Sequence, residues 1–152
     1  MYVTVTELFA DLDQSEAARL TDDENRGESA IDWSDDADPA TSRVIGAIAE
    51  ACDEIDASLR GRYDVPLVPP PLLVKRIAKA LTVRRLHARR PTDGLPSSVI
   101  DEGRAALDLL RAIGRGDALL EGASVADVRP IEIAANRASD ERAFSDDTLE
   151  RY

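Results

Sequence analysis

The sequence is poor in the residues that support disulfide bonding, metal binding and membrane insertion. It has one cysteine, Cys52, and one histidine, His87, among 152 residues. A single cysteine excludes an internal disulfide framework and leaves no cysteine cluster for a structural zinc site. No apolar run approaches the roughly 18 residues that a membrane span needs, and the N-terminus lacks the basic-then-apolar order of a signal peptide. We therefore expect a soluble, unexported protein made in a reducing cytoplasm.

Motifs for catalysis and cofactor binding are equally scarce. The sequence has no Ser-His-Asp constellation, Walker loop, Gly-rich dinucleotide turn or H-E-x-x-H spacing. His87 stands among arginines, which disfavour its protonation, and no neighbouring carboxylate orients it. Residues 22–27 resemble the start of a calcium loop, but Arg26 and Trp33 occupy positions that need oxygen ligands. We expect no enzymatic activity, no cofactor and no metal site.

Charge is abundant and unevenly distributed along the chain. The net charge is −11, whereas proteins that read nucleic acids carry a basic footprint. Residues 11–38 hold eleven acids and two bases, residues 72–91 hold seven bases and no acid, and residues 117–152 hold nine acids and four bases. Neither nucleic acid nor an anionic membrane is therefore the expected partner.

Residues 59–72 form a corner where two helical patterns meet. Gly61 is predicted to end the first helix with a positive φ, because it has no Cβ to clash in that conformation. Prolines at 66 and 69–71 fix φ and lack N–H donors, so the segment is expected to run extended until one proline begins the next helix. Tyr63 has two interpretations, core packing or a subunit contact.

Three main helices are predicted around this corner. The first begins at Asp38-Pro39, an N-cap followed by proline, and the second ends before Pro91. Ser98 and Asp101 form a weaker capping box for the third, which ends at Gly114 or Gly116. The apolar stripe of the first helix recurs at steps of three and four: Val44, Ile48, Ala51, Cys52, Ile55 and Leu59.

Shorter and less regular segments flank these helices. Thr4 and Glu7 have the spacing of a capping box, which predicts a short helix over about residues 5–12, with another turn or two at 15–20. The acidic stretch 21–38 is predicted to be a loop anchored by Trp33. The fold class is therefore all-α: a small bundle of about three main helices with a short N-terminal helix.

The C-terminal residues have scattered apolar side chains without helical periodicity. We expect a helical core over residues 1–116 and an extended arm over residues 117–152, which becomes ordered only against a partner. Residues 131–133 alternate as a short strand would. The partner-binding candidates of the arm are Val128, Ile131, Ile133, Phe144, Leu149 and Tyr152.

The seven bases of residues 72–91 allow three interpretations. They form a solvated face or pair with acids of the same subunit, they meet acidic stretches of a neighbouring copy or partner, or they contact nucleic acid. The last is disfavoured because aromatic side chains that stack on bases are not interleaved with them. The candidates for inter-subunit contacts, including two residues of the corner, are Lys75, Arg76, Arg84, Arg85, Arg62 and Tyr63.

A series of short motifs accompanies these elements. In chain order they are Met1-Tyr2-Val3-Thr4, Leu20-Thr21-Asp22, Asp53-Glu54-Ile55-Asp56, Leu59-Arg60-Gly61-Arg62-Tyr63-Asp64-Val65-Pro66-Leu67, Val68-Pro69, Leu72-Leu73-Val74, Arg84-Arg85-Leu86-His87 and Phe144-Ser145-Asp146-Asp147-Thr148-Leu149. With this order and spacing, the chain resembles the head–tail joining (connector or adaptor) proteins of Mu-like bacteriophages and prophages over nearly its whole length. The corner motif is the most specific part.

The resemblance implies a virion structural protein without chemistry, made in the host bacterial cytoplasm and located at the head–tail junction. It implies a homo-oligomeric ring beneath the portal protein, following the portal's twelve-fold order and meeting a neck or tail-terminator protein. The arm would dock on the portal, and DNA would pass through the channel without sequence-specific binding, since acidic residues repel phosphates. The alternative is a small DNA-associated protein that uses residues 75–90.

Overall fold

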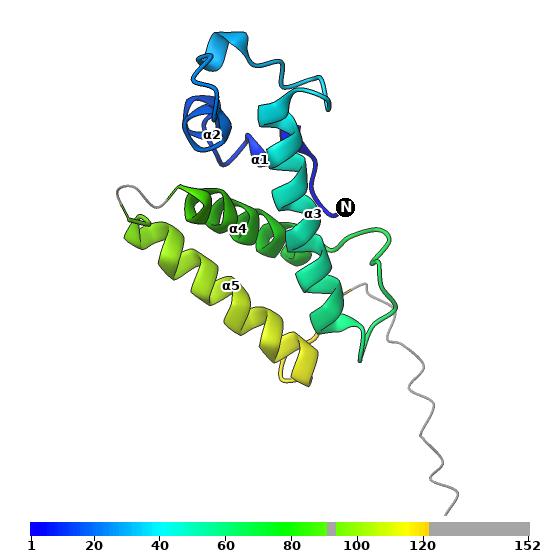
Figure 1. The fold of residues 1–152 in the computed structure, drawn as a ribbon. Coiled ribbons are helices and arrows are strands. Elements are labelled where there is room, and N and C mark those ends of the chain that lie inside the picture. The colour runs from blue at the N-terminus through cyan, green and yellow to red at the C-terminus, as the bar shows by residue number, and fades with distance from the viewer. Residues whose placement is uncertain (91–93, 122–152) are drawn as a thin grey trace, which may run out of the picture.

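The computed structural model describes residues 1–90 and 94–121, and all regular secondary structure in these residues is helical (Figure 1). The elements in chain order are α1 (Val5–Leu8), α2 (Gln14–Thr21), the 3-10 helix η1 (Glu28–Ala30), α3 (Pro39–Leu59), α4 (Leu72–Arg89) and α5 (Ser97–Arg115). Helix α4 packs against both α3 and α5, and α2 packs against α3 and α4. This arrangement confirms the predicted all-α bundle. None of the described helices is long and apolar enough to span a membrane.

Helix α3 is the central element and begins as the sequence predicted. The carboxylate of Asp38 accepts a hydrogen bond from the backbone N–H of Ala40 at 2.8 Å, and Pro39 occupies the first turn. The whole predicted stripe, from Val44 to Leu59, is buried. Burial of one face explains why 21 residues with both acids and bases stay helical.

Helices α4 and α5 complete the core through Ile77, Leu81, Leu110 and Ile113, all of which are at most 2 % exposed. Helix α5 ends as predicted at Gly116, whose φ of 90° lets its N–H reach the carbonyls of residues 112 and 113.

The predicted capping box at the start of α5 is wrong. The helix begins at Ser97, after Pro96, and no side chain caps it. Ser98 therefore lies inside the first turn, where its hydroxyl cannot act as the cap for Asp101. The extended backbone of Pro96, with ψ near 139°, sets the start two residues earlier than the Ser-x-x-Asp spacing indicated.

The corner at residues 59–72 differs from the prediction at Gly61, whose φ is not positive. Helix α3 ends in a tight turn instead, in which the N–H groups of Arg62 and Tyr63 both donate to the carbonyl of Leu59 at 2.9 Å. This turn satisfies the last carbonyl without a left-handed residue. The peptide bonds before Pro66 and Pro69 are cis, and Pro71 caps α4 rather than beginning it.

The N-terminal segment forms two short helices. The capping box of Thr4 and Glu7 is confirmed, with the N–H of Glu7 donating to the hydroxyl of Thr4 at 3.2 Å. Helix α1 nevertheless ends at Leu8 rather than near residue 12. Helix α2 is a separate helix of eight residues, because the side chain of Asp13 caps it.

The acidic stretch before α3 is held by two apolar side chains. Ile31 is buried, and the ring of Trp33 packs edge-on against Phe9 of the α1 region, with centroids 4.9 Å apart. This position agrees with Trp33 as an anchor of the loop.

At the C-terminal end of the described residues, Leu120 is buried in the core, whereas residues 122–152 lie outside the described residues. The predicted arm residues Val128, Ile131, Ile133, Phe144, Leu149 and Tyr152 therefore have no structural description.

Candidate assembly surface

Two lysines of α4 pair with acids at the N-terminus of the same chain. The ammonium of Lys75 lies 2.7 Å from a carboxylate oxygen of Glu7, and that of Lys79 lies 2.8 Å from Asp11. Each pair joins α4 to α1 or to the turn after it. The hydrogen bond from Lys75 is the main reason that the pKa of Glu7 is lowered to about 2. These bases serve the fold of one subunit.

The end of α4 pairs with the residues that follow α2. Asp23 accepts a hydrogen bond from Arg89 and lies 2.8 Å from Nη2 of Arg90 and 3.2 Å from Nε of Arg43. These guanidinium groups, Arg89 first, lower the pKa of Asp23 to about 2. Arg89 also donates to the backbone carbonyl of Leu20 at 3.0 Å. The C-terminal end of α4 is thus tied to the acidic stretch of its own chain.

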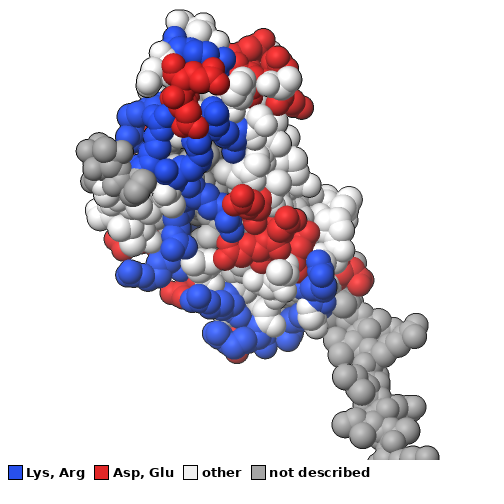
Figure 2. All heavy atoms as spheres, in the orientation of Figure 1, with Lys and Arg blue, Asp and Glu red and all other residues white. Residues whose placement is uncertain are grey.

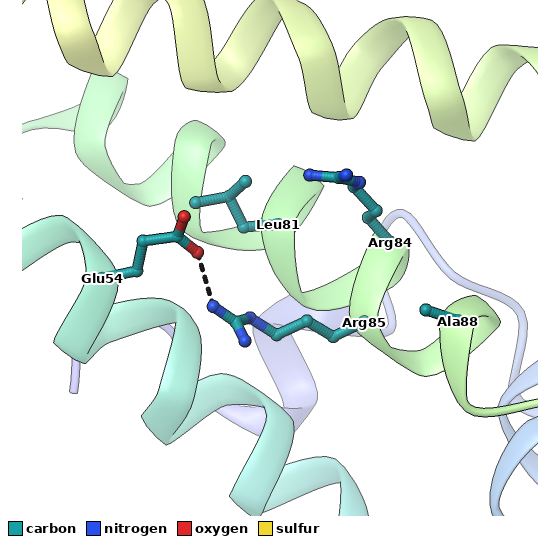
Figure 3. A pocket seen from close by; sticks show the side chains of 5 residues that line it. All are labelled: Glu54, Leu81, Arg84, Arg85 and Ala88. Atoms are coloured by element: carbon teal, nitrogen blue, oxygen red, sulfur yellow. Dashed lines mark hydrogen bonds and ion pairs between the residues drawn. The ribbon is translucent and has the colours of Figure 1, made fainter.

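Arg85 crosses from α4 to α3 and borders a cavity. Its guanidinium donates to Glu54 and lies 3.1 Å from Glu50 (Figure 3). The cavity has a volume of about 220 Å³ and is lined by Glu54, Leu81, Arg84, Arg85 and Ala88. Figure 3 shows the guanidinium of Arg84 extending toward α5, away from the pair of Arg85 and Glu54. The charges of Glu54 and Arg85 therefore neutralise each other on one side of the cavity, whereas Arg84 makes the other side cationic.

Arg84 and Arg76 are the two bases of α4 for which no ion pair is found among the described residues. Both are exposed. The alkyl stem of Arg84 lies over Gly103 of α5, where an added Cβ would come within 2.6 Å of its Cδ. Because Gly103 has no side chain, the alkyl stem of Arg84 can pack against α5 there, and this packing positions the guanidinium beside the cavity.

The two candidates in the corner lie against the rest of the subunit. Tyr63 is 1 % exposed, and its hydroxyl accepts a hydrogen bond from the N–H of Leu120 at 3.2 Å. Of its two interpretations, this burial favours core packing, and the subunit contact stays a prediction. Arg62 is half-buried, with its guanidinium beside the backbone of Gly116.

An arginine organises the acidic stretch that resembled a calcium loop. Arg26 makes two parallel hydrogen bonds of 2.9 Å to the carboxylate of Asp38, and its Nε lies 3.5 Å from Asp22. Arg26 holds the pKa of Asp38 well below its usual range, and the backbone N–H of Gly27 lowers that of Asp22. Within the described residues no group of three metal-ligating side chains gathers. Arg26 therefore ties the residues after α2 to the N-cap residue of α3.

Acidification is expected to destabilise the protein as the pH falls from about 4.5 toward 2. Glu7 and Asp23 have folded-state pKa values of about 2, against 4.5 and 3.8 for the free groups. The folded state therefore takes up these protons later than the unfolded state, and the stabilisation present above pH 4.5 is lost on the way down. Thermal melts followed by circular dichroism at pH 7, 4 and 3 measure this loss. A Glu7→Gln variant should show a smaller loss, and an unchanged melting temperature in the wild type would contradict the ion-pair account.

His87 has a carboxylate neighbour that the sequence did not reveal. Its Nε2 lies 3.4 Å from an oxygen of Glu16, and its side chain is 5 % exposed. The prediction that no carboxylate orients it is wrong, because α2 packs against α4 and brings Glu16 to it across 71 positions of sequence. No local pattern around His87 indicated this partner.

Tyr2 connects the N-terminus to α3 and to the corner. Its hydroxyl donates to Asp56 and accepts from the N–H of Leu67 at 3.1 Å, while its backbone N–H donates to the sulfur of Cys52 at 3.2 Å. Burial, and then the hydrogen bond to Asp56, raise the pKa of Tyr2 to about 12. The only signal in the sequence for this role was that Tyr2 belongs to the motif Met1-Tyr2-Val3-Thr4.

Tyr2→Phe is expected to destabilise the protein by roughly 1 to 2 kcal/mol, since the buried N–H of Leu67 loses its acceptor. The aromatic ring keeps its packing in this variant. Urea denaturation at pH 7 measures the change, with Thr6→Val at an exposed position as the control. Equal stability of Tyr2→Phe and wild type would mean that the hydroxyl does not hold the corner.

The described residues thus define a small all-α protein whose charged groups are used mainly in ion pairs within the chain. The family described as "Bacteriophage Mu, Gp36" matches residues 2–136. The match covers most of the sequence, so the chain belongs to this family, and it is a Mu-like phage protein of structure or morphogenesis. A search of curated proteins found no match. The predicted relation to Mu-like phages is confirmed at this level.

Proposed function

We propose that this protein is a head–tail connector, or adaptor, that forms a ring beneath the portal protein and joins the DNA-filled head to the neck or tail. Family membership supports a structural role in a phage particle. The observation that carries the proposal is the pairing of five of the seven bases of residues 72–91 with acids of the same chain. Because these bases already pair with carboxylates, they form a weak binding surface for phosphate groups. The same ion pairs hold the helices of one subunit together.

In this proposal the ring follows the twelve-fold order of the portal, and the chain catalyses no reaction. The C-terminal arm docks on the portal through the residues that follow Leu120, which itself packs in the core of the subunit, while the remaining surfaces contact neighbouring copies and a neck or tail-terminator protein. DNA passes through the channel without sequence-specific binding. Arg76 and Arg84 are the bases of α4 best placed for contacts between subunits, because both are exposed and no ion pair holds them in the described residues.

Co-sedimentation with assembled portal tests this function. The full chain is expected to sediment with the portal, and a variant that lacks residues 134–152 is expected to keep its helical circular dichroism and remain in the supernatant. The core helices end before the deleted segment, so the variant tests attachment rather than folding. Retained attachment of the shortened chain would assign the portal contact to another surface, and no attachment of the full chain would oppose the connector function.

Fluorescence anisotropy with duplex DNA separates this function from that of a small DNA-associated protein. The connector is expected to show little affinity at moderate salt. A protein that binds phosphates through residues 75–90 would bind tightly at low salt and lose affinity steeply as salt rises. Tight, salt-dependent binding would therefore favour the DNA-associated alternative.

A further inference from the structure

Several acids that the fold does not pair with bases gather at one end of the subunit. Within the described residues, no ion pair is found for four exposed acids of one short segment, Glu28, Asp32, Asp35 and Asp36. We call residues 28–36 the acidic loop. It lies beside the N-terminal end of α3, at the top of the view in Figures 1 and 2. The loop therefore presents net negative charge at one end of the subunit.

Two exposed bases for which no ion pair is found in the described residues, Arg76 and Arg84, lie on a different element, α4. Figure 2 shows a basic band over α4 and α5, beside an acidic patch over α3. Arg84 borders the cavity of about 220 Å³, its stem lies over Gly103, and no ion pair is found for it in the described residues. Glu54, the acid that lines the cavity, pairs with Arg85 instead. A carboxylate from outside would thus meet an open guanidinium beside the side chains of Leu81 and Ala88.

The acidic loop is built to present such a carboxylate. The oxygen of Asp32 accepts from the N–H of Ser34 at 3.0 Å, and that of Asp35 accepts from the N–H of Ala37 at 2.9 Å, so both hold the loop backbone. For Asp36 no hydrogen bond or ion pair is found in the described residues, and the residue is exposed. Asp36 is therefore, like Glu28 at the start of the loop, an acid whose carboxylate is available to a neighbour, and Asp36 lies next to the two carboxylates that hold the loop backbone.

We propose that the cavity beside Arg84 receives the acidic loop of a second copy of this chain, with Asp36 pairing with Arg84. The inference rests on the proposed ring. No ion pair joins the loop to Arg84 within one subunit, and the two surfaces have opposite charge. Because loop and cavity are different surfaces, the contact is head-to-tail, and a head-to-tail contact generates a ring where its rotation closes and an open filament where it does not. Each copy gives its loop to one neighbour and its cavity to the other.

A charge swap tests this contact in the full-length chain. Sedimentation velocity over a range of concentrations at low salt is expected to show self-association of the wild type. Arg84→Glu and Asp36→Arg are each expected to weaken it about tenfold or more, because a like-charge pair replaces an attractive one. An equimolar mixture of the two variants is expected to associate again, since every contact in an alternating ring then joins opposite charges. Arg111→Glu, an equal charge change at an exposed position of α5, should associate as the wild type does.

The outcomes separate this contact from the connector function. Both substituted side chains are exposed, so circular dichroism is expected to show folded variants. Variants that associate as the wild type does, or a wild type that stays monomeric, would overturn the contact, while co-sedimentation with the portal judges the connector function independently. If Arg84→Glu removed duplex binding in the anisotropy assay and left self-association intact, the cavity would take phosphate groups and the proposal would fall.

Discussion

Tyr63→Ala is expected to destabilise the protein by about 3 to 5 kcal/mol, the usual range for truncation of a buried aromatic residue. Tyr63 ranks among the largest fully buried side chains and is 1 % exposed. It lies in the corner between α3 and α4, and its hydroxyl accepts the N–H of Leu120 beyond the end of α5. Truncation would leave a cavity between the end of α3 and the residues that follow α5. Urea denaturation followed by circular dichroism measures the loss.

Tyr63→Phe separates the ring from the hydroxyl and is the matched control. It keeps the packing and removes one hydrogen bond, so a loss of about 1 kcal/mol is expected. The two variants also decide between the two interpretations of Tyr63. If Tyr63→Ala unfolded at the same urea concentration as the wild type but no longer assembled, the residue would act between subunits despite its burial.

The parts of the fold that the sequence predicted are those set by local rules. The stripe from Val44 to Leu59 repeats at helical spacing, and burial of one helix face requires that spacing. The Asp38 cap and the end of α5 at Gly116 follow from hydrogen bonds made within one turn. Gly61 shows the limit of such rules, since a tight turn ended α3 without a positive φ.

The candidate surface was predicted less completely, because it depends on which helices become neighbours. Lys75 pairs with Glu7 across 68 positions, and Arg90 pairs with Asp23 across 67 positions. Nothing in the local sequence of α4 distinguishes these bases from Arg84, for which no ion pair is found in the described residues. The sequence predicted a basic helix, and only the packing of α1, α2 and α3 against it determines which of its charges remain available.

A second large effect is expected where α5 crosses α3. Gly114→Ala is expected to destabilise the protein by about 1 to 3 kcal/mol, since an added Cβ would lie 2.8 Å from the backbone carbonyl oxygen of Ser58. A backbone atom cannot rotate away as a side chain can, so the two helices would have to separate. The separation would also disturb Ile113, which is fully buried next to the substitution. Thermal and urea denaturation measure the change.

Gly46→Ala is the matched control, because it makes the same chemical change inside α3. An added Cβ at Gly46 meets nothing within 4 Å, so alanine should stabilise the protein by about 0.5 to 1 kcal/mol through its higher helix propensity. The two substitutions are therefore expected to have opposite signs. The same propensity gain acts at Gly114, and a stabilised Gly114→Ala would mean that α5 can move away from α3 without loss. In that case the close crossing of the helices would not be what fixes the end of α5 beside the corner.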